Sequence, residues 1–402
     1  MREMYGIILT LVMLLMTGCT ADDVVMETKT APEGGVAISF SCNYDDEGVY
    51  ITKAGHEGAM NTEDLHTTGF GAMASVTAGN DPGDNKPDLM YNQEVAFTLV
   101  GDLENPRKGY WSYEPKKYWP SDLTNCYISA YAPYMSPDDL AALAGLSEED
   151  LEKETGIIGI SANNEAPYID YRRCEKPSEV VDLLWYYEKP SAIPAGTALN
   201  KAGTLAMQMH HALARLEIKV ALAADPGTTK VLVEEITLKG KMAKTGRLHL
   251  YEQTTTTEEV EEVEVTKYYP IWSDQTFDLD HTIIIDNDET NEASYGIIDT
   301  PIRYIPGLPR EWQPEGLKYC DNGGEGKGFQ NALNTGDRKG YIYLIPQNEE
   351  LNLKITVKYQ KWESGVAEPT ERTKTTEAAV TTIADPLKGN KTYTLNLTLS
   401  GI

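Results

Sequence analysis

The first group with a definite chemistry is the thiol of Cys19, which follows an apolar segment near the start of the chain. That segment, residues 6–16, is too short to cross a bilayer, because a spanning helix needs about 20 apolar residues. Its length is typical of a signal peptide. Thr17 and Gly18 directly before the cysteine resemble a lipobox, in which the cysteine sulfur is acylated. The sequence therefore predicts a signal peptide at 1–18 and lipid attachment to Cys19, with an ordinary secretory signal as the alternative.

Other stretches contain residue types that bind metals or phosphates, but they lack the required spacing. His210 and His211 are adjacent, so in a strand they point to opposite faces, and we expect His211 beside the core. The oxygen-rich segment 286–291 lacks the glycine and the terminal glutamate of an EF-hand loop. The glycine-rich segment 323–328 lacks the P-loop spacing. The sequence has no GxSxG or HExxH motif, so we expect no enzymatic activity, no metal and no cofactor.

The chain is strongly acidic, since 62 Asp and Glu against 35 Lys and Arg give a formal net charge of −27. Such a surface would repel phosphates, which argues against nucleic acid as a partner. It also argues against electrostatic adhesion to anionic lipid, so attachment to a membrane would depend on the acyl chains. Besides Cys19, the cysteines at 42, 126, 174 and 320 allow three disulfide pairings. We expect most of them to be unpaired, because a chain of this length can build a core without disulfides.

Alternating apolar and polar residues predict β-strands along most of the remaining chain. The pattern begins at Val36–Ser41 and ends at Thr392–Leu399, which alternates strictly. One helical segment interrupts it, because Ser136 is followed by a proline and by an acid three residues later, a helix-start pattern that recurs in shorter form at Ser147. The sequence predicts a mainly β protein with a short helical insertion in the first of two tandem β-sandwiches. We expect a tether at 19–35 and domains at 36–204 and 205–402.

Several segments, taken in order, are similar to the fimbrillin-like (Mfa-like) family of Bacteroidetes lipoprotein pilins: Tyr110–Pro120, Ile128–Tyr134, His211–Leu216, Tyr343–Gln347 and Gly389–Leu395. The resemblance implies that both sandwiches are transthyretin-like. It also implies a structural or accessory (tip or adhesin) subunit of pili that mediates cell adhesion. Its partners would be other pilus subunits and a host or glycan ligand, and its location the outer membrane and the cell surface.

The resemblance further implies a mode of assembly, in which a protease removes the first strand and a neighbouring subunit supplies a replacement. An open sheet edge has unpaired N–H and C=O groups, which an added strand satisfies. Here Val36–Ser41 is the strand that would be removed. The candidate donor row is Leu395, Leu397 and Leu399, whose side chains share one face of the last strand. The alternative is that this strand only completes its own domain.

The candidate cleavage site departs from the family pattern. Family members often carry Thr-Arg-Ala and are cut after the arginine, whereas this chain has Thr52–Ala54 with a lysine in the middle. After Arg2, the next arginine is Arg107. Either a lysine-tolerant protease cuts between Lys53 and Ala54, or the first strand is retained and the subunit caps or anchors a filament.

Aromatic residues provide the basis for a second hypothesis. The chain has 24 Tyr and 6 Trp against 5 Phe, and such amphipathic rings suit both interfaces and stacking on sugars. The rings at Trp111, Tyr113, Tyr118 and Trp119 are expected to pack inside the protein. The rings at 268, 269 and 272 follow an acidic run and are candidates for an exposed hairpin. The alternative function is therefore a monomeric surface lipoprotein that binds glycans.

Overall fold

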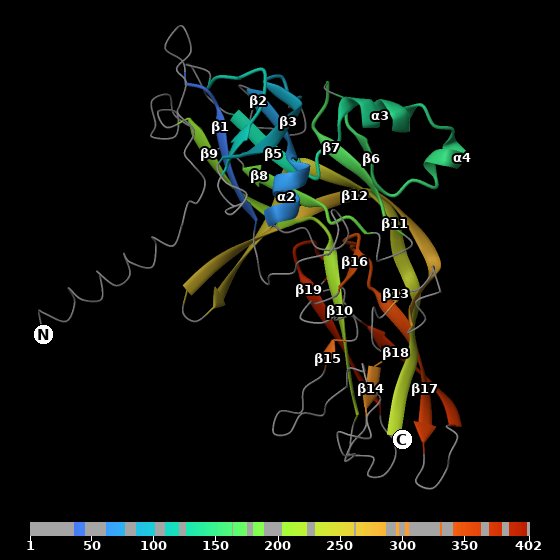
Figure 1. Cartoon of the computed structure of the whole chain (residues 1–402). Helices are drawn as coiled ribbons and strands as arrows, with labels where there is room; N and C mark the ends of the chain where they lie inside the picture. The colour runs from blue at the N-terminus through green and yellow to red at the C-terminus, as the bar shows by residue number, and fades with distance from the viewer. Residues whose placement is uncertain are drawn as a thin grey trace, which may run out of the picture.

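The molecule is mainly β-structure, as the alternating sequence pattern predicts (Figure 1). The computed structural model describes residues 36–44, 62–76, 86–100, 109–119, 126–162, 164–174, 180–188, 203–222, 230–260, 263–286, 295–296, 302–304, 330–331, 341–362, 370–379 and 386–399. These residues form three sheets and three short helices, and the sheets pack face to face in sandwich-like layers.

The first half of the chain is built around a seven-stranded sheet in the order β1-β9-β8-β5-β2-β3-β4. Its strands are β1 (Ser39–Tyr44), β2 (Phe70–Val76), β3 (Met90–Leu99), β4 (Gly109–Ser112), β5 (Cys126–Ala132), β8 (Leu184–Glu188) and β9 (Thr204–His211). One face of this sheet encloses an apolar core that includes Phe70, Ile128, Leu184 and Met207. Helix α2 (Thr62–Thr68) adds Leu65 to the same core.

The second half contains a smaller sheet packed against a long one. The smaller sheet consists of β10 (Ala214–Leu222), β15 (Gln330–Asn331), β16 (Ile342–Leu344) and β19 (Thr392–Leu399). The eight-stranded sheet consists of β6 (Gly156–Ile160), β7 (Tyr168–Arg172), β11 (Lys230–Val260), β12 (Val263–Asp286), β13 (Tyr295–Gly296), β14 (Ile302–Tyr304), β17 (Asn352–Trp362) and β18 (Thr370–Ala379). Alternate residues of β10, such as Leu216 and Ile218, pack with Leu238 and Ile355 of the long sheet.

The two halves share a third core, which lies on the other face of the seven-stranded sheet. There Trp185 and Tyr131 pack with residues of the long sheet, including Leu248. Strand β7 belongs to the first half by sequence but pairs with β11 of the second half. The expected boundary at 204/205 falls at the start of β9, which pairs with β1 and β8, so the sheet of the first half continues to His211. That division into two domains remains a prediction.

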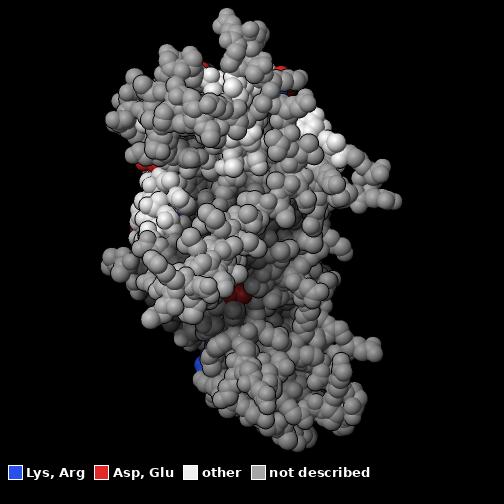
Figure 2. Space-filling model, turned by 90° about the vertical axis from the view of Figure 1, so that its left-hand side faces the viewer, with Lys and Arg blue, Asp and Glu red and all other residues white. Residues whose placement is uncertain are grey.

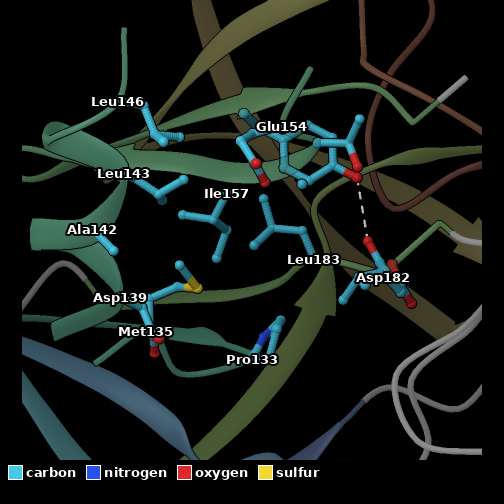
Figure 3. A pocket seen from close by; sticks show the side chains of 14 residues that line it. Pro133, Met135, Asp139, Ala142, Leu143, Leu146, Glu154, Ile157, Asp182 and Leu183 are labelled. Atoms are coloured by element: carbon cyan, nitrogen blue, oxygen red, sulfur yellow. Dashed lines mark hydrogen bonds between the residues drawn. The ribbon is translucent and has the colours of Figure 1, made fainter. Parts of the chain in front are cut away.

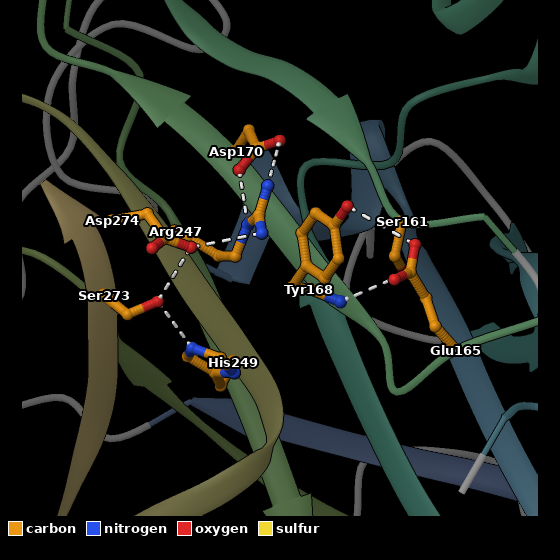
Figure 4. A network of polar contacts seen from close by, with 8 residues as sticks. All are labelled: Ser161, Glu165, Tyr168, Asp170, Arg247, His249, Ser273 and Asp274. Atoms are coloured by element: carbon orange, nitrogen blue, oxygen red, sulfur yellow. Dashed lines mark hydrogen bonds and ion pairs between the residues drawn. The ribbon is translucent and has the colours of Figure 1, made fainter. Parts of the chain in front are cut away.

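A polar cluster on the surface also ties β7 to the β11–β12 hairpin (Figure 4). The guanidinium of Arg247 on β11 pairs with Asp170 of β7 at 2.9 Å and with Asp274 of β12 at 3.1 Å. The same guanidinium lies over the ring of Tyr168, 3.7 Å from its centroid. The cluster links three adjacent strands, and the charge of Arg247 is paired within it. We therefore interpret the cluster as a structural contact between these strands.

The predicted helical insertion is present between β5 and β6. Helix α3 (Pro137–Ala144) begins after Ser136, whose hydroxyl accepts a hydrogen bond from the N–H of Asp139. Helix α4 (Glu148–Leu151) begins in the same way after Ser147. Both helices stand at one side of the molecule and bury none of their residues (Figure 1). The serine caps were therefore sufficient to locate the helices from sequence.

Candidate assembly site around the first strand

Strand β1 is held on one side by a parallel ladder with β9. The register runs from Ser39 opposite Thr204 to Tyr44 opposite Met209. The hydroxyls of Ser39 and Thr204 lie 2.7 Å apart and add a side-chain hydrogen bond at the start of the ladder. Strand β1 therefore satisfies the outer main-chain groups of β9, which would otherwise form an open sheet edge.

The other side of the same segment is held by the chain that follows β4. The N–H of Ile38 donates to the carbonyl of Lys117, and the N–H of Trp119 donates to the carbonyl of Val36, both at 2.9 Å. The phenol of Tyr113 donates to the carbonyl of Ile38 at 2.9 Å. Burial raises the pKa of this phenol to about 12, so it stays protonated and able to donate at neutral pH. The first segment thus closes a gap between β9 and residues 113–119.

Alternate side chains of the first segment point into the core. Ile38, Phe40 and Cys42 are 1 %, 6 % and 2 % exposed. The ring of Phe40 lies edge-on to Phe70 and tilted against Tyr113, with both centroid distances at 5.6 Å. Removal of this segment would open a groove with an apolar wall and an unpaired edge, the two features that a complementing strand requires.

The last strand, β19, lies in an equivalent position in the other half of the molecule. It runs parallel to β10, from Thr392 opposite Arg215 to Leu399 opposite Leu222. Leu395 and Leu397 are buried in the C-terminal core, while the side chain of Leu399 lies outside the described residues. In this structure the last strand therefore completes its own domain.

The positions of β1 and β19 are equivalent because each strand pairs with one of two consecutive strands. Strands β9 and β10 are consecutive and are separated only by Ala212 and Leu213. Strand β1 is parallel to the first and β19 is parallel to the second. Every second side chain joins an apolar core: Ile38, Phe40 and Cys42 in the first segment, and Tyr393, Leu395 and Leu397 in the last strand. The two terminal strands thus share orientation and apolar spacing.

Comparison with known proteins gives the family, from residues that follow β1. The profile of the fimbrillin-like family matches residues 48–402. The chain belongs to the fimbrillin-like family. A crystal structure of a fimbrial protein from Bacteroides vulgatus aligns with a TM-score of 0.50 and 17 % sequence identity over 90 % of this chain and 95 % of that one, a similarity that concerns the fold.

Two further crystal structures give weaker alignments to this fimbrillin-like chain. A proposed cell adhesion protein from Bacteroides uniformis aligns with a TM-score of 0.37 at 10 % identity, covering 91 % of this chain and 94 % of that one. A proposed cell adhesion protein from Bacteroides ovatus aligns with a TM-score of 0.35 at 13 % identity, covering 90 % and 91 %. These scores are too low to support an argument. A search of curated proteins finds no match.

The aromatic clusters of this fimbrillin-like protein are mainly internal. Trp111, Tyr113 and Trp119 are buried, which confirms their predicted packing role. The second cluster lies on a hairpin, formed by β11 and β12, but its rings are buried or half-buried. Tyr269 is 5 % exposed, and the half-buried Trp272 donates from its indole nitrogen to the carbonyl of Ala212 at 3.2 Å. These rings therefore join the hairpin to the body of the protein.

His211 is buried, as predicted, but it ends β9, whereas the sequence suggested that the histidine pair begins a strand. Its Nδ1 is 2.6 Å from a carboxylate oxygen of Asp182, and both side chains are buried. Sequence reasoning missed this pair, because the partners are 29 positions apart and no local pattern joins them. Within the described ranges, no group of three His, Cys, Asp or Glu side chains could hold a metal ion.

Several predicted sites fall outside the described residues: Cys19, Lys53, Ala54, Cys320, and the segments 287–291 and 323–328. Cys42, Cys126 and Cys174 are buried thiols. None of the helices in the described part of the chain has the length and apolar character of a membrane span.

Proposed function

We propose that this fimbrillin-like protein is a structural or accessory (tip or adhesin) pilus subunit that assembles by β-strand complementation and mediates cell adhesion. The observation that carries the proposal is the setting of the first segment, residues 36–44, which is bonded on both sides and inserts Ile38, Phe40 and Cys42 into the core. The family and the fold of a fimbrial protein agree with a role at the cell surface.

Cleavage between Lys53 and Ala54 would release β1 and create the acceptor. Strand β9 would then lose its outer hydrogen-bonding partner, and the phenol of Tyr113 would lose the Ile38 carbonyl. Phe70 would lose the ring of Phe40 that now covers it. An open edge with apolar recesses at alternate positions binds an extended strand through main-chain bonds and side-chain pockets.

The donor in this proposal is the last strand of a neighbouring subunit. Its row of Leu395, Leu397 and Leu399 has the spacing that fills alternate pockets, and β19 has the same parallel relation to β10 as β1 has to β9. For this exchange β19 must leave β10 of its own chain. Each subunit thus gives up the β1–β9 and β19–β10 ladders and gains one new ladder on β9, so the freed edge of β10 must be satisfied by water.

The signal peptide and Cys19 place the precursor at the outer membrane in this proposal, with the tether at 19–35 between lipid and β1. On the face that Figure 1 shows at the left, the described side chains visible at the surface are mostly uncharged (Figure 2). These described side chains therefore add little to the repulsion between two acidic subunits.

The test is a set of variants at the candidate cleavage site, followed on denaturing gels without heating. Subunits joined by strand complementation should run as high-mass ladders that collapse on boiling. Lys53→Ala should abolish the ladder, whereas Lys53→Arg should preserve it, because trypsin-like proteases accept both basic residues. A ladder that survives Lys53→Ala would contradict the proposed acceptor. A strictly monomeric protein that binds polysaccharide in affinity electrophoresis would instead support the glycan-binding alternative.

A further inference from the structure

A cavity of about 490 Å³ lies beneath helix α3 (Figure 3). One side is formed by Leu143 of the helix and by Leu146 just beyond it. The opposite side is formed by Ile157 of β6 and by Leu183, with Met135 between them. Leu146 is 38 % exposed and Leu143 is half-buried, whereas Ile157 and Leu183 are buried, so the aliphatic side chains left accessible are those on the side of α3, which buries none of its own residues. We call this cavity the α3 pocket.

The mouth of the α3 pocket is acidic. Asp139 and Glu154 both line it and are exposed. The segment from α3 to the start of β6 carries further acids and a single basic residue, Lys153, whose ammonium is 2.9 Å from Asp150. Arg172 of β7 donates to the main-chain carbonyls of Leu151 and Glu154 and keeps its positive charge, but Arg172 and Lys153 together are outnumbered by the seven acids of residues 137–156. The field at the mouth is therefore negative and favours a cationic partner.

The phenol of Tyr171 and one carboxylate oxygen of Asp182, at the floor of the pocket, are engaged within the protein. The phenol of Tyr171 donates to the carbonyl of Val181 at 3.2 Å, as the dashed line in Figure 3 marks. Asp182 pairs with His211 behind the floor. The pocket therefore offers apolar contact inside and negative charge at its rim. This size and lining are those of a binding pocket with a small number of orienting charges.

We propose that the α3 pocket binds a bulky apolar side chain carried by a cationic peptide segment of a partner protein. The apolar side chain would cover Leu143, Leu146 and Ile157, and the flanking ammonium or guanidinium groups would lie near Asp139 and Glu154. An anionic amphiphile would meet the acidic rim unfavourably. The pocket is separate from the β1 groove, so this inference does not depend on strand complementation.

The test uses three fluorescein-labelled pentapeptides and the full chain, with binding followed by fluorescence anisotropy. The probes carry a central Trp between lysines, a central Gly between lysines, and a central Trp between glutamates. We expect the Lys–Trp probe to bind about 30-fold more tightly than either control, as is usual for a buried anchor residue. Equal binding of all three probes, or no binding, would overturn the proposal.

Matched variants on α3 link the binding to the pocket. Ala142 lines the pocket, whereas its neighbour Ala141 does not, and both are exposed. Ala142→Trp should abolish binding by filling the cavity, while Ala141→Trp should leave it unchanged. Glu154→Gln should weaken binding about two- to fivefold, and Glu152→Gln, outside the pocket, should have no effect. If the two variants of either pair change the binding affinity equally, the α3 pocket is not the binding site.

Sedimentation of the unlabelled protein distinguishes a second copy from a foreign partner. The proposal expects Ala142→Trp to leave the oligomeric state unchanged. If the protein self-associates and Ala142→Trp removes that association, the occupant is a segment of this same chain, and the proposal of a separate partner is overturned.

Discussion

Replacement of Phe40 by alanine measures how strongly the first strand is held. Phe40 is 6 % exposed and touches the rings of Phe70 and Tyr113. Truncation of a buried Phe to Ala costs about 3–5 kcal/mol of unfolding free energy, through lost burial and the cavity left behind. The two ring contacts place this site at the upper end of that range. Ser41→Ala on the same strand is the control, and it should cost less than about 0.5 kcal/mol.

The assay is urea unfolding of the uncleaved protein, followed by tryptophan fluorescence, because Trp111 and Trp119 lie in the same core as Phe40. Phe40→Ala should lower the urea midpoint well below that of Ser41→Ala. The same substitution should leave the heat stability of assembled filaments unchanged, because the account has β1 removed before assembly. Equal midpoints for the two variants would refute the packing argument, and filaments weakened by Phe40→Ala would show that β1 is retained in them.

Three further predictions concern neighbouring groups. Tyr113→Phe leaves the buried carbonyl of Ile38 without its phenol donor and should cost about 1–3 kcal/mol in urea unfolding. Burial lowers the pKa of His66 to about 4, below its ordinary value, so only the unfolded chain gains a proton as the pH falls from 6.5. Stability measured by thermal unfolding should therefore decrease between pH 6.5 and 4, and His66→Gln should flatten that dependence. Asp182→Ala removes the buried partner of His211 and should cost about 3–5 kcal/mol, whereas a loss near zero would exclude a structural role for the pair.

Local signals in the sequence were sufficient to predict the positions of individual helices and strands. The serine and proline at 136 and 137 located α3, and the strict alternation at 392–399 located β19 and its buried face. Such signals act over a few residues, so they predict where an element begins and which face is apolar. The burial of Trp111 and Trp119 was also predicted.

The pairing of strands and side chains that lie far apart in the chain could not be predicted from the sequence. Nothing near β1 indicates that it runs parallel to a strand 165 positions further along the chain, or that Tyr113 bonds to it. The attachment of β7 to β11 and the Asp182–His211 pair are of the same kind. The inward packing of the second aromatic cluster could not be predicted for a related reason. Trp272 on β12 bonds to the carbonyl of Ala212, which is far away in sequence.

The central claim is that β1 is removed before a neighbouring strand takes its place. Intact mass and N-terminal mapping of subunits sheared from the cell surface test it most directly. The account predicts filament subunits that begin at Ala54 and carry no lipid. Filament subunits that begin at acylated Cys19 and still contain Ser39–Tyr44 would contradict it.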